Sequence, residues 1–562
     1  MTAAASIRSL ADELADVEFW DDPFYASMMA VSGYEDAVPD LSPEHRQEWR
    51  GRLSDIIVRC GEAESEEGDT DSSVLLAAAG DHAVRSLAWA DSRLDEFSVT
   101  TFPLGGPSRM LLVASRTRLG DPDSAAAYLT RCKRLPAHLD QYTDVVRAAA
   151  RAGLLPVAPL VDDALRQVRE HLSRPERDPM LSREPPAGWD GTAAWRAEVE
   201  KVVGDEIRPA IGRYADLLVE LLPRSRPPER SGLLYVPGGV AAYACSVRVG
   251  TTLPLDPEEI HRTGLAALAE IEDAIAELGR DALGVRSATE AMARLRESTQ
   301  PSVDGNGAMS RAATAVGRAQ ERLGGLLHDP MPPPCAVEPM PPHMAEFGAP
   351  PYYSPPARDG TRPGAYLFNN VQPGQAGSWA LEATAFHEAV PGHHAQFSRL
   401  QLLPDLPMLL SSFNVVPHSE GWGLYAERLA DEAGLYSDDT QRLGMLSCAA
   451  WRAVRLVVDT GLHARGWSRA RAREFALSHS PMPEDFVNAE IDRYIALPGQ
   501  ALGYLIGQRE ILRLREHARA QLGAAFDIRD FHSAVLDHGT LPLTVLRGVV
   551  EEWVRGKQSM QI

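Results

Sequence analysis

The chain has 562 residues, of which 44% are hydrophobic, and its formal net charge is −22. This length and apolar content suit a large globular protein with a sizeable core. The acidity argues against nucleic acid or a membrane surface as a partner, because both carry negative charge. Five widely separated cysteines form no C-x-x-C pair, so neither a disulfide framework nor a thiolate zinc site is indicated.

The N-terminal segment, residues 1–15, has the pattern of an amphipathic helix rather than a basic stretch followed by an apolar core. No run of the sequence approaches the roughly 18 apolar residues that a membrane span requires. We therefore expect a cytoplasmic protein. The sequence gives no indication of the oligomeric state.

The first part of the chain, residues 1–225, shows helical periodicity interrupted by proline and glycine. Composition shifts toward proline and arginine at residues 223–228, which indicates a joint. We predict a helical region at 1–225 that forms scaffold and cleft wall, and a catalytic region at 226–562. The expected fold is mostly α, large and two-lobed, with a deep cleft.

A helix should begin after Asp256, because this residue can cap it with Pro257 in the first position and Glu259 in the third. Further on, residues 331–365 are rich in proline, which excludes helix and central strand there. The alternatives are a disordered linker or ordered loops. Tyr352, Tyr353 and the alternating pattern at 364–370 favour ordered loops and a short edge strand beside the next helix, where an extended substrate would bind.

The most distinctive stretch, residues 385–397, places three histidines and a glutamate among apolar side chains. His387-Glu388 resembles the start of H-E-x-x-H, in which two histidines bind zinc and the glutamate acts as base. Here Pro391 replaces the second histidine and disfavours a continuous helix. His394 returns to the face of His387 in a straight helix, whereas His393 requires a bulge or kink at residues 391–392.

Two carboxylates follow about thirty residues later. Glu420 and Glu427 are seven positions apart, so a helix places both on one face, among aromatic and small residues. A helix that carries a glutamate ligand at this distance from an H-E motif is the layout of glutamate-liganded zinc peptidases. A solvent-exposed acidic face is the alternative.

Further candidates lie in the last quarter of the chain. Asp459 and His463 are one helical turn apart, so that the carboxylate can orient the imidazole. A packed histidine near a helix end is the alternative. Tyr504, with Tyr494 as the second choice, is placed to supply a hydroxyl donor for an oxyanion, although a packing tyrosine fits the sequence nearly as well.

The motifs His387-Glu388-x-x-Pro391-Gly392-His393-His394 and Glu420-Gly421-Trp422-x-Leu424-Tyr425-x-Glu427 resemble those of the bacterial domain-of-unknown-function family 885. That family resembles the carboxypeptidase Taq family of zinc peptidases and, more distantly, the thimet-type oligopeptidases. The resemblance implies a helical zinc-peptidase-like fold with a small β element beside the metal-binding helix. The residues that it assigns are His387, His393 and Glu420 as ligands of one zinc ion and Glu388 as general base.

Further residues are expected to act beside these. Glu427 would orient a ligand imidazole, His394 is the alternative ligand, and Asp459 and His463 match an Asp-x-Gly-x-His pattern. Tyr504 would stabilise the oxyanion, and Tyr352, Tyr353 and Tyr494 would contact substrate. The expected function is a zinc metallopeptidase of carboxypeptidase or oligopeptidase type. The alternatives are hydrolysis of a non-peptide amide or ester, and a metal-free binding protein on a decayed peptidase fold.

Overall fold

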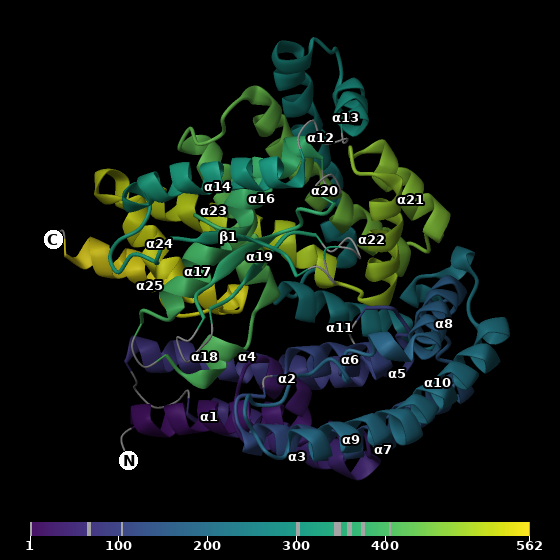
Figure 1. Cartoon of the computed structure of the whole chain (residues 1–562). Coiled ribbons are helices and arrows are strands. Elements are labelled where there is room, and N and C mark those ends of the chain that lie inside the picture. The colour runs from purple at the N-terminus through teal and green to yellow at the C-terminus, as the bar shows by residue number, and fades with distance from the viewer. Residues whose placement is uncertain are drawn as a thin grey trace.

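The computed structural model describes residues 3–63, 69–102, 105–117, 119–298, 304–341, 345, 350–356, 362–372, 377–403 and 406–560. The chain is mostly helical and contains a small three-stranded sheet, as the sequence predicts. Figure 1 shows the helices of the first part of the chain, coloured purple to blue, below those of the second part, coloured teal to yellow.

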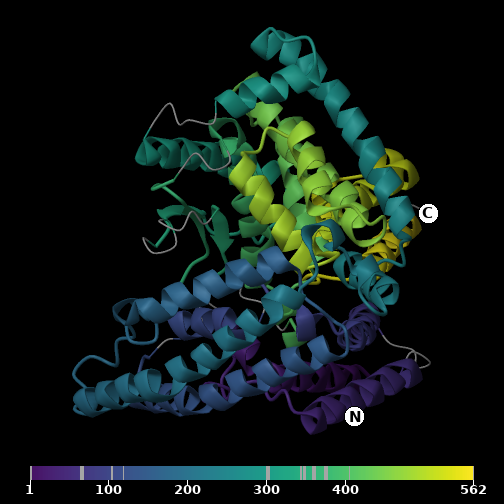
Figure 2. The ribbon, with the colours of Figure 1, turned by 90° about the vertical axis from the view of Figure 1, so that its right-hand side faces the viewer.

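Ten α-helices precede residue 225. They are α1 (Ala3–Asp21), α2 (Pro23–Met28), α3 (Pro43–Ala63), α4 (Thr70–Ser92), α5 (Leu94–Phe97), α6 (Gly106–Arg116), α7 (Pro122–Arg151), α8 (Ala158–Ser173), α9 (Thr192–Val202) and α10 (Arg208–Leu221) within the described ranges. Figure 2, turned by a quarter, shows the long helices of this part lying below the second part of the chain.

The second part begins with α11 (Gly239–Thr251), α12 (Pro257–Leu283), α13 (Ala288–Glu297) and α14 (Gly305–Arg322). The helices that follow the sheet are α16 (Leu381–Glu388), α17 (His393–Leu400), α18 (Met408–Ser412), α19 (Val416–Glu432), α20 (Asp439–His463), α21 (Arg469–Ser478), α22 (Glu484–Ala496), α23 (Gly503–Leu522), α24 (Ile528–Leu536) and α25 (Leu543–Ser559). Asp256 accepts hydrogen bonds from the backbone of Glu258 and Glu259, which confirms the predicted start of α12.

The sheet consists of β1 (Ala336–Pro339), β2 (Tyr352–Ser354) and β3 (Ala365–Phe368) in the order β1-β3-β2. β3 pairs with β1 in parallel and with β2 antiparallel, where Tyr353 faces Tyr366. The strand predicted just before the helix of the metal motif is therefore present as β3, but it is the central strand, and β1 and β2 are the edges. Of the proline-rich stretch, residues 342–344, 346–349 and 357–361 lie outside the described residues.

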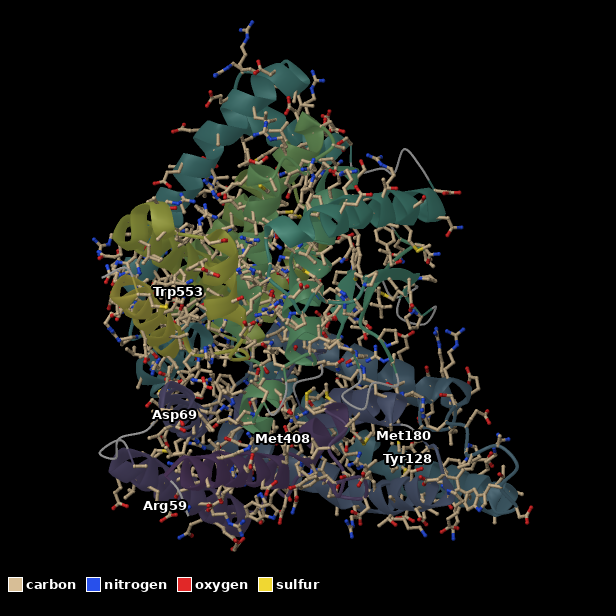
Figure 3. The ribbon with its side chains drawn as sticks, turned by 90° about the vertical axis from the view of Figure 1, so that its left-hand side faces the viewer. Arg59, Asp69, Tyr128, Met180, Met408 and Trp553 are labelled. Carbon is tan, nitrogen blue, oxygen red and sulfur yellow. The ribbon has the colours of Figure 1, made fainter. Side chains whose placement is uncertain are left out.

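Two large groups of buried apolar side chains hold the chain together. The smaller group belongs to α2 and α6–α10, and the larger one joins α1, α3 and α4 to the helices of the second part. In Figure 3, Tyr128 and Met180 of the smaller group lie in the lower part of the molecule, whereas Trp553, which packs against the larger group, lies above them. The first helices thus share a core with the proposed catalytic region, while the boundary near residue 225 stays a prediction.

Two helix pairs position the site. α12 packs along α20, and α19 packs along α23. The second pair is close because glycines meet at the crossing: a Cβ atom on Gly421 would lie 2.5 Å from the backbone carbon of Gly507. This close approach brings Tyr504 beside α19. No helix in the described ranges is long and apolar enough to cross a lipid bilayer.

Candidate metal centre

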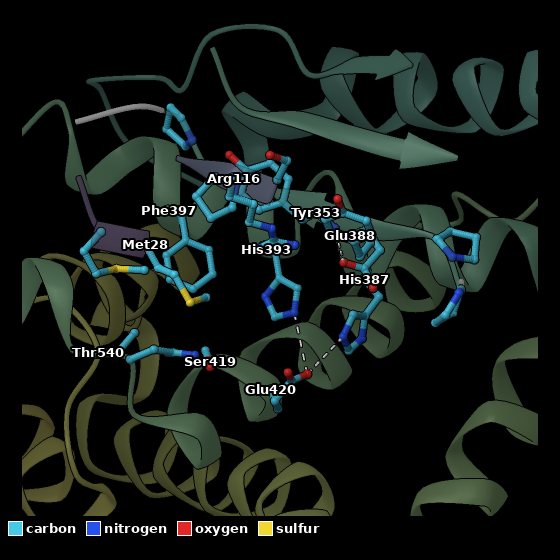
Figure 4. A pocket seen from close by; sticks show the side chains of 18 of the residues that line it. Met28, Arg116, Tyr353, His387, Glu388, His393, Phe397, Ser419, Glu420 and Thr540 are labelled. Atoms are coloured by element: carbon cyan, nitrogen blue, oxygen red, sulfur yellow. Dashed lines mark hydrogen bonds and ion pairs between the residues drawn. The ribbon is translucent and has the colours of Figure 1, made fainter. Parts of the chain in front are cut away.

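A cavity of about 2810 Å³ opens between the two parts of the chain. Its walls include Met28 and Arg116 from the first part, β2, and residues of α16, α17, α19, α20 and α23 from the second. Figure 4 shows His387, Glu388, His393 and Glu420 together on this wall. Residues from both parts of the chain therefore line this cavity.

Three potential metal ligands converge in the cavity wall. Nε2 of His387 lies 3.4 Å from Oε2 of Glu420, and Nε2 of His393 lies 3.6 Å from the same oxygen. One ligand atom from each residue lies within 4.8 Å of the others. Donor atoms around tetrahedral zinc, with bonds of about 2.0–2.2 Å, stand roughly 3.3–3.6 Å apart. Two imidazoles and a carboxylate at these separations fit a zinc ion.

A break between α16 and α17 places His393 in this group. α16 ends at Glu388, Ala389 and Gly392 have non-helical dihedral angles, and the Val390–Pro391 peptide is cis. The indole of Trp422 on α19 donates hydrogen bonds to the carbonyls of Pro391 and Gly392, at 3.0 and 3.3 Å. The two motifs of the sequence therefore contact each other, and the break allows His393 rather than His394 to face His387.

His394 points away from the other three residues. It is fully buried, its Nε2 donates to the carbonyl of Pro333 at 2.6 Å, and its Nδ1 lies 3.3 Å from the hydroxyl of Ser398. The alternative that makes His394 a ligand is therefore wrong for this structure, because the ideal spacing of seven applies only to an unbroken helix.

Glu427 orients the His387 imidazole. Its Oε1 accepts a hydrogen bond from Nδ1 of His387 at 2.8 Å, which leaves Nε2 directed toward Glu420. Burial alone would lower the pKa of His387, but its hydrogen bonds to Glu420 and Glu427 outweigh this effect and raise the pKa to about 10. The site thus concentrates negative potential that favours a cation.

Glu388 lies beside the ligand group without belonging to it. Its Oε2 accepts a hydrogen bond from the backbone N–H of Tyr353 at 2.8 Å. That N–H points outward from β2, so the edge of the sheet faces Glu388 and the cavity. Tyr352 and Tyr353 both line the cavity, and the outward edge belongs to β2 rather than to the strand predicted at 364–370.

Tyr504 lies on the cavity wall near Glu420. Burial raises the pKa of its phenol, and the negative charge of Glu420 adds to the effect, so the hydroxyl keeps its proton at neutral pH. The guanidinium of Arg455 stacks over its ring at 4.2 Å from the centroid. A protonated hydroxyl held in this way can donate a hydrogen bond to a negatively charged oxygen in the cavity.

Tyr494 does not line the cavity. It is fully buried, and its hydroxyl donates to Glu490 at 2.7 Å and accepts from Nε of Arg455 at 3.0 Å. The prediction that it contacts substrate is corrected by this position: Tyr494 supports the arginine and glutamate side chains that form the wall.

Asp459 and His463 lie behind the wall with separate partners. Nε2 of His463 donates to the carbonyl of Tyr494 at 3.0 Å and Nδ1 accepts from the N–H of Leu233 at 3.2 Å, while burial lowers its pKa to about 3. Asp459 accepts hydrogen bonds from the Tyr243 hydroxyl and the Gly499 N–H. Neither residue faces the cavity, which corrects the expected catalytic role of His463 and its pairing with Asp459.

Asp459 makes stability depend on pH. Burial raises its pKa from 3.8 to about 7 in the folded protein, so its proton favours folding below about pH 4, and this contribution is lost as pH rises through 7. At 1.36 kcal/mol per pKa unit, the loss between pH 5 and 8 is about 2–3 kcal/mol. Asparagine does not titrate, so Asp459→Asn should not lose this stability. Relative to wild type, the free energy of unfolding of the variant should therefore be higher at pH 8 than at pH 5 by this amount. Urea unfolding with chelator at both pH values measures it, and an equal difference at both would contradict the assignment.

Three arginines that also line the cavity were not predicted as site residues from the sequence: Arg452 and Arg455 on α20, and Arg493 on α22. A sequence feature could have revealed Arg452 and Arg455: they are two arginines three positions apart within an otherwise apolar helical run. Such charges are rarely buried without a partner or a function.

Comparison with known proteins supports the assignment made from the two motifs. The profile of the family described as "Bacterial protein of unknown function (DUF885)" matches residues 23–550, and the chain belongs to this family. No functionally curated protein matches.

Two solved structures share the fold. The crystal structure of a putative lipoprotein from Colwellia psychrerythraea superimposes with a TM-score of 0.88 at 25% identity, over 99% of this chain and 100% of that one. A putative lipoprotein of unknown function from Shewanella oneidensis gives a TM-score of 0.75 at 15% identity, over 97% and 99% of the two chains. The cytoplasmic location of the present protein stays a prediction.

Proposed function

We propose that the protein is a zinc-dependent metallopeptidase, of carboxypeptidase or oligopeptidase type and similar to the carboxypeptidase Taq family. The observation that carries the proposal is the convergence of His387, His393 and Glu420 at spacings that fit tetrahedral zinc, in the wall of a large cavity. In protein sites of this composition, three protein ligands leave one position open for water or substrate.

The neighbouring residues have the positions that hydrolysis requires. A zinc ion held by these ligands supplies Lewis acidity and lowers the pKa of water. Glu388 lines the same cavity outside the ligand group, where it accepts a proton from water and returns it to the leaving amine. The hydroxyl of Tyr504 donates a hydrogen bond to the developing oxyanion.

The surroundings favour a peptide as substrate. The cavity, at about 2810 Å³, exceeds the roughly 300–1,000 Å³ of ordinary small-molecule pockets. The edge strand β2 lies along it beside Glu388, and such an edge can hold an extended main chain. Size and an available strand edge together favour a peptide over a small amide or ester.

Metal content is the direct test. Protein purified without chelator should contain close to one zinc ion per chain, and His387→Ala and Glu420→Ala should each lose it, because two remaining ligands bind zinc weakly. Elemental analysis measures the metal, and circular dichroism checks that the variants fold. A wild-type protein that neither contains zinc nor takes it up would overturn the proposal. A zinc protein that cleaves esters or non-peptide amides but no peptide would replace it by the wider class of metallohydrolases.

A further inference from the structure

Three arginines form a positively charged wall next to the metal centre. Arg452 and Arg455 project from the same face of α20, and Arg493 projects from α22. They are well buried for arginines, and Arg455 is only 7% exposed. All three line the same cavity as His387 and Glu420.

Positive charge exceeds negative charge in this cluster. Glu490 pairs with both Arg455 and Arg493, at 3.1 and 2.8 Å. Glu427 lies 3.5 Å from Arg452 but also accepts the hydrogen bond of His387. Two carboxylates therefore pair with three guanidinium groups, so the cluster has an excess of one positive charge.

Two buried donors of the cluster lack hydrogen-bond partners in the described part of the chain, namely Nε of Arg452 and Nη1 of Arg455. A buried unpaired donor of a charged group destabilises the folded protein. An anion bound at the cluster would balance the excess positive charge. Carboxylate suits a guanidinium because its two oxygens match the paired donors.

The cluster adjoins the position of the scissile bond. Arg452 contacts Glu427, which contacts the ligand His387, and Arg455 stacks on Tyr504. The reacting carbonyl lies between the metal ligands and the Tyr504 hydroxyl under the proposed function. A carboxylate bound at the cluster is therefore only a short length of peptide away from that carbonyl.

Building on the proposed function, we propose that Arg452 and Arg455 bind the C-terminal carboxylate of a peptide substrate, with Arg493 holding Glu490 in place. The protein then cleaves near the C-terminus. Water adds across the peptide bond: its hydroxyl joins the carbonyl carbon, the C–N bond breaks, and the proton reaches the leaving amine through Glu388. The substrate class is peptides with a free C-terminus.

Binding to zinc-loaded Glu388→Gln, measured by isothermal titration calorimetry, tests the proposal without turnover. The probes are an N-blocked trialanine with a free carboxylate, its C-terminal amide, and an amide peptide that carries a glutamate side chain. We expect the free acid to bind about tenfold to a hundredfold more tightly than the first amide, as a charge-assisted contact implies. Equal affinities, a preference for the glutamate-bearing amide, or no binding of any probe would overturn it.

Arginine variants locate the contact. Arg452→Gln and Arg455→Gln, each added to Glu388→Gln, should lose most of the preference for the free acid. Arg442→Gln is the matched control on α20, because Arg442 is 42% exposed and pairs with Asp431 and Asp439 outside the cavity. Preference retained in both cavity variants would exclude this cluster as the carboxylate site. The comparison of acid with amide in the unaltered cluster stands even if an arginine variant fails to fold.

Cleavage assays separate this inference from the proposed function. If the zinc-loaded wild type cuts amidated peptides internally as fast as free acids, the protein is a peptidase and the C-terminal site is wrong. If it cleaves no peptide while its preference for the free acid persists, the carboxylate site stands and the peptidase proposal fails.

Discussion

Glu388→Gln should lower kcat by about 10²–10⁴-fold without loss of zinc, because the amide cannot take up a proton. Its oxygen can still accept the N–H of Tyr353, so the local structure should persist. Peptide turnover and elemental zinc analysis of the same preparation measure the two quantities.

The control for this variant is Glu474→Gln, which changes an exposed glutamate on α21. It should keep wild-type turnover. A Glu388→Gln protein with turnover within twofold of wild type would remove Glu388 from the mechanism, and one that lost its zinc would show that Glu388 helps to hold the metal.

Gly423→Ala should release most of the zinc although every ligand remains. A Cβ atom at Gly423 would lie 2.6 Å from Cε1 and 2.7 Å from Nε2 of His387, so the imidazole must move. The ring is buried and its Nδ1 is hydrogen-bonded to Glu427, so it has little freedom to adapt. We expect zinc affinity to fall at least about 10–100-fold, the loss typical when the orientation of a ligand is disturbed. Competition with a chromophoric chelator measures the affinity.

Gly212→Ala is the matched control, because this helical glycine on α10 has no atoms within 4 Å of an added Cβ. Alanine there should raise stability by about 0.5–1 kcal/mol through helix propensity and leave zinc affinity unchanged. An unchanged affinity in Gly423→Ala would mean that His387 does not need its observed orientation.

The ligand residues could be predicted from the sequence because each of them belongs to a short motif whose spacing carries the information. Glu420 and Glu427 share one continuous helix, so a spacing of seven places both toward His387. The choice between His393 and His394 depended on a break whose shape is set by Trp422, a contact across about thirty residues. The motif matched to the family favoured His393, whereas ideal helix geometry favoured His394.

Other predictions failed where the position of a side chain depends on packing between elements that are distant in the sequence. His463 and Tyr494 have suitable chemistry, but helix periodicity does not reveal which side of a buried helix faces a cavity and which faces packed backbone. The same limit hid Arg452 and Arg455, which lie in an apolar helical run. The central position of β3 also depends on pairing with β1, about thirty residues earlier in the chain.

The division of buried side chains into two groups has a thermodynamic consequence. Because α1, α3 and α4 belong to the larger group, a fragment that starts after residue 225 would expose the apolar surface that these helices cover. Most buried apolar residues of α6–α10 belong to the smaller group, so these helices can lose their structure on heating separately from release of the metal. Heating should therefore show two transitions, of which zinc stabilises only the one that melts the larger group.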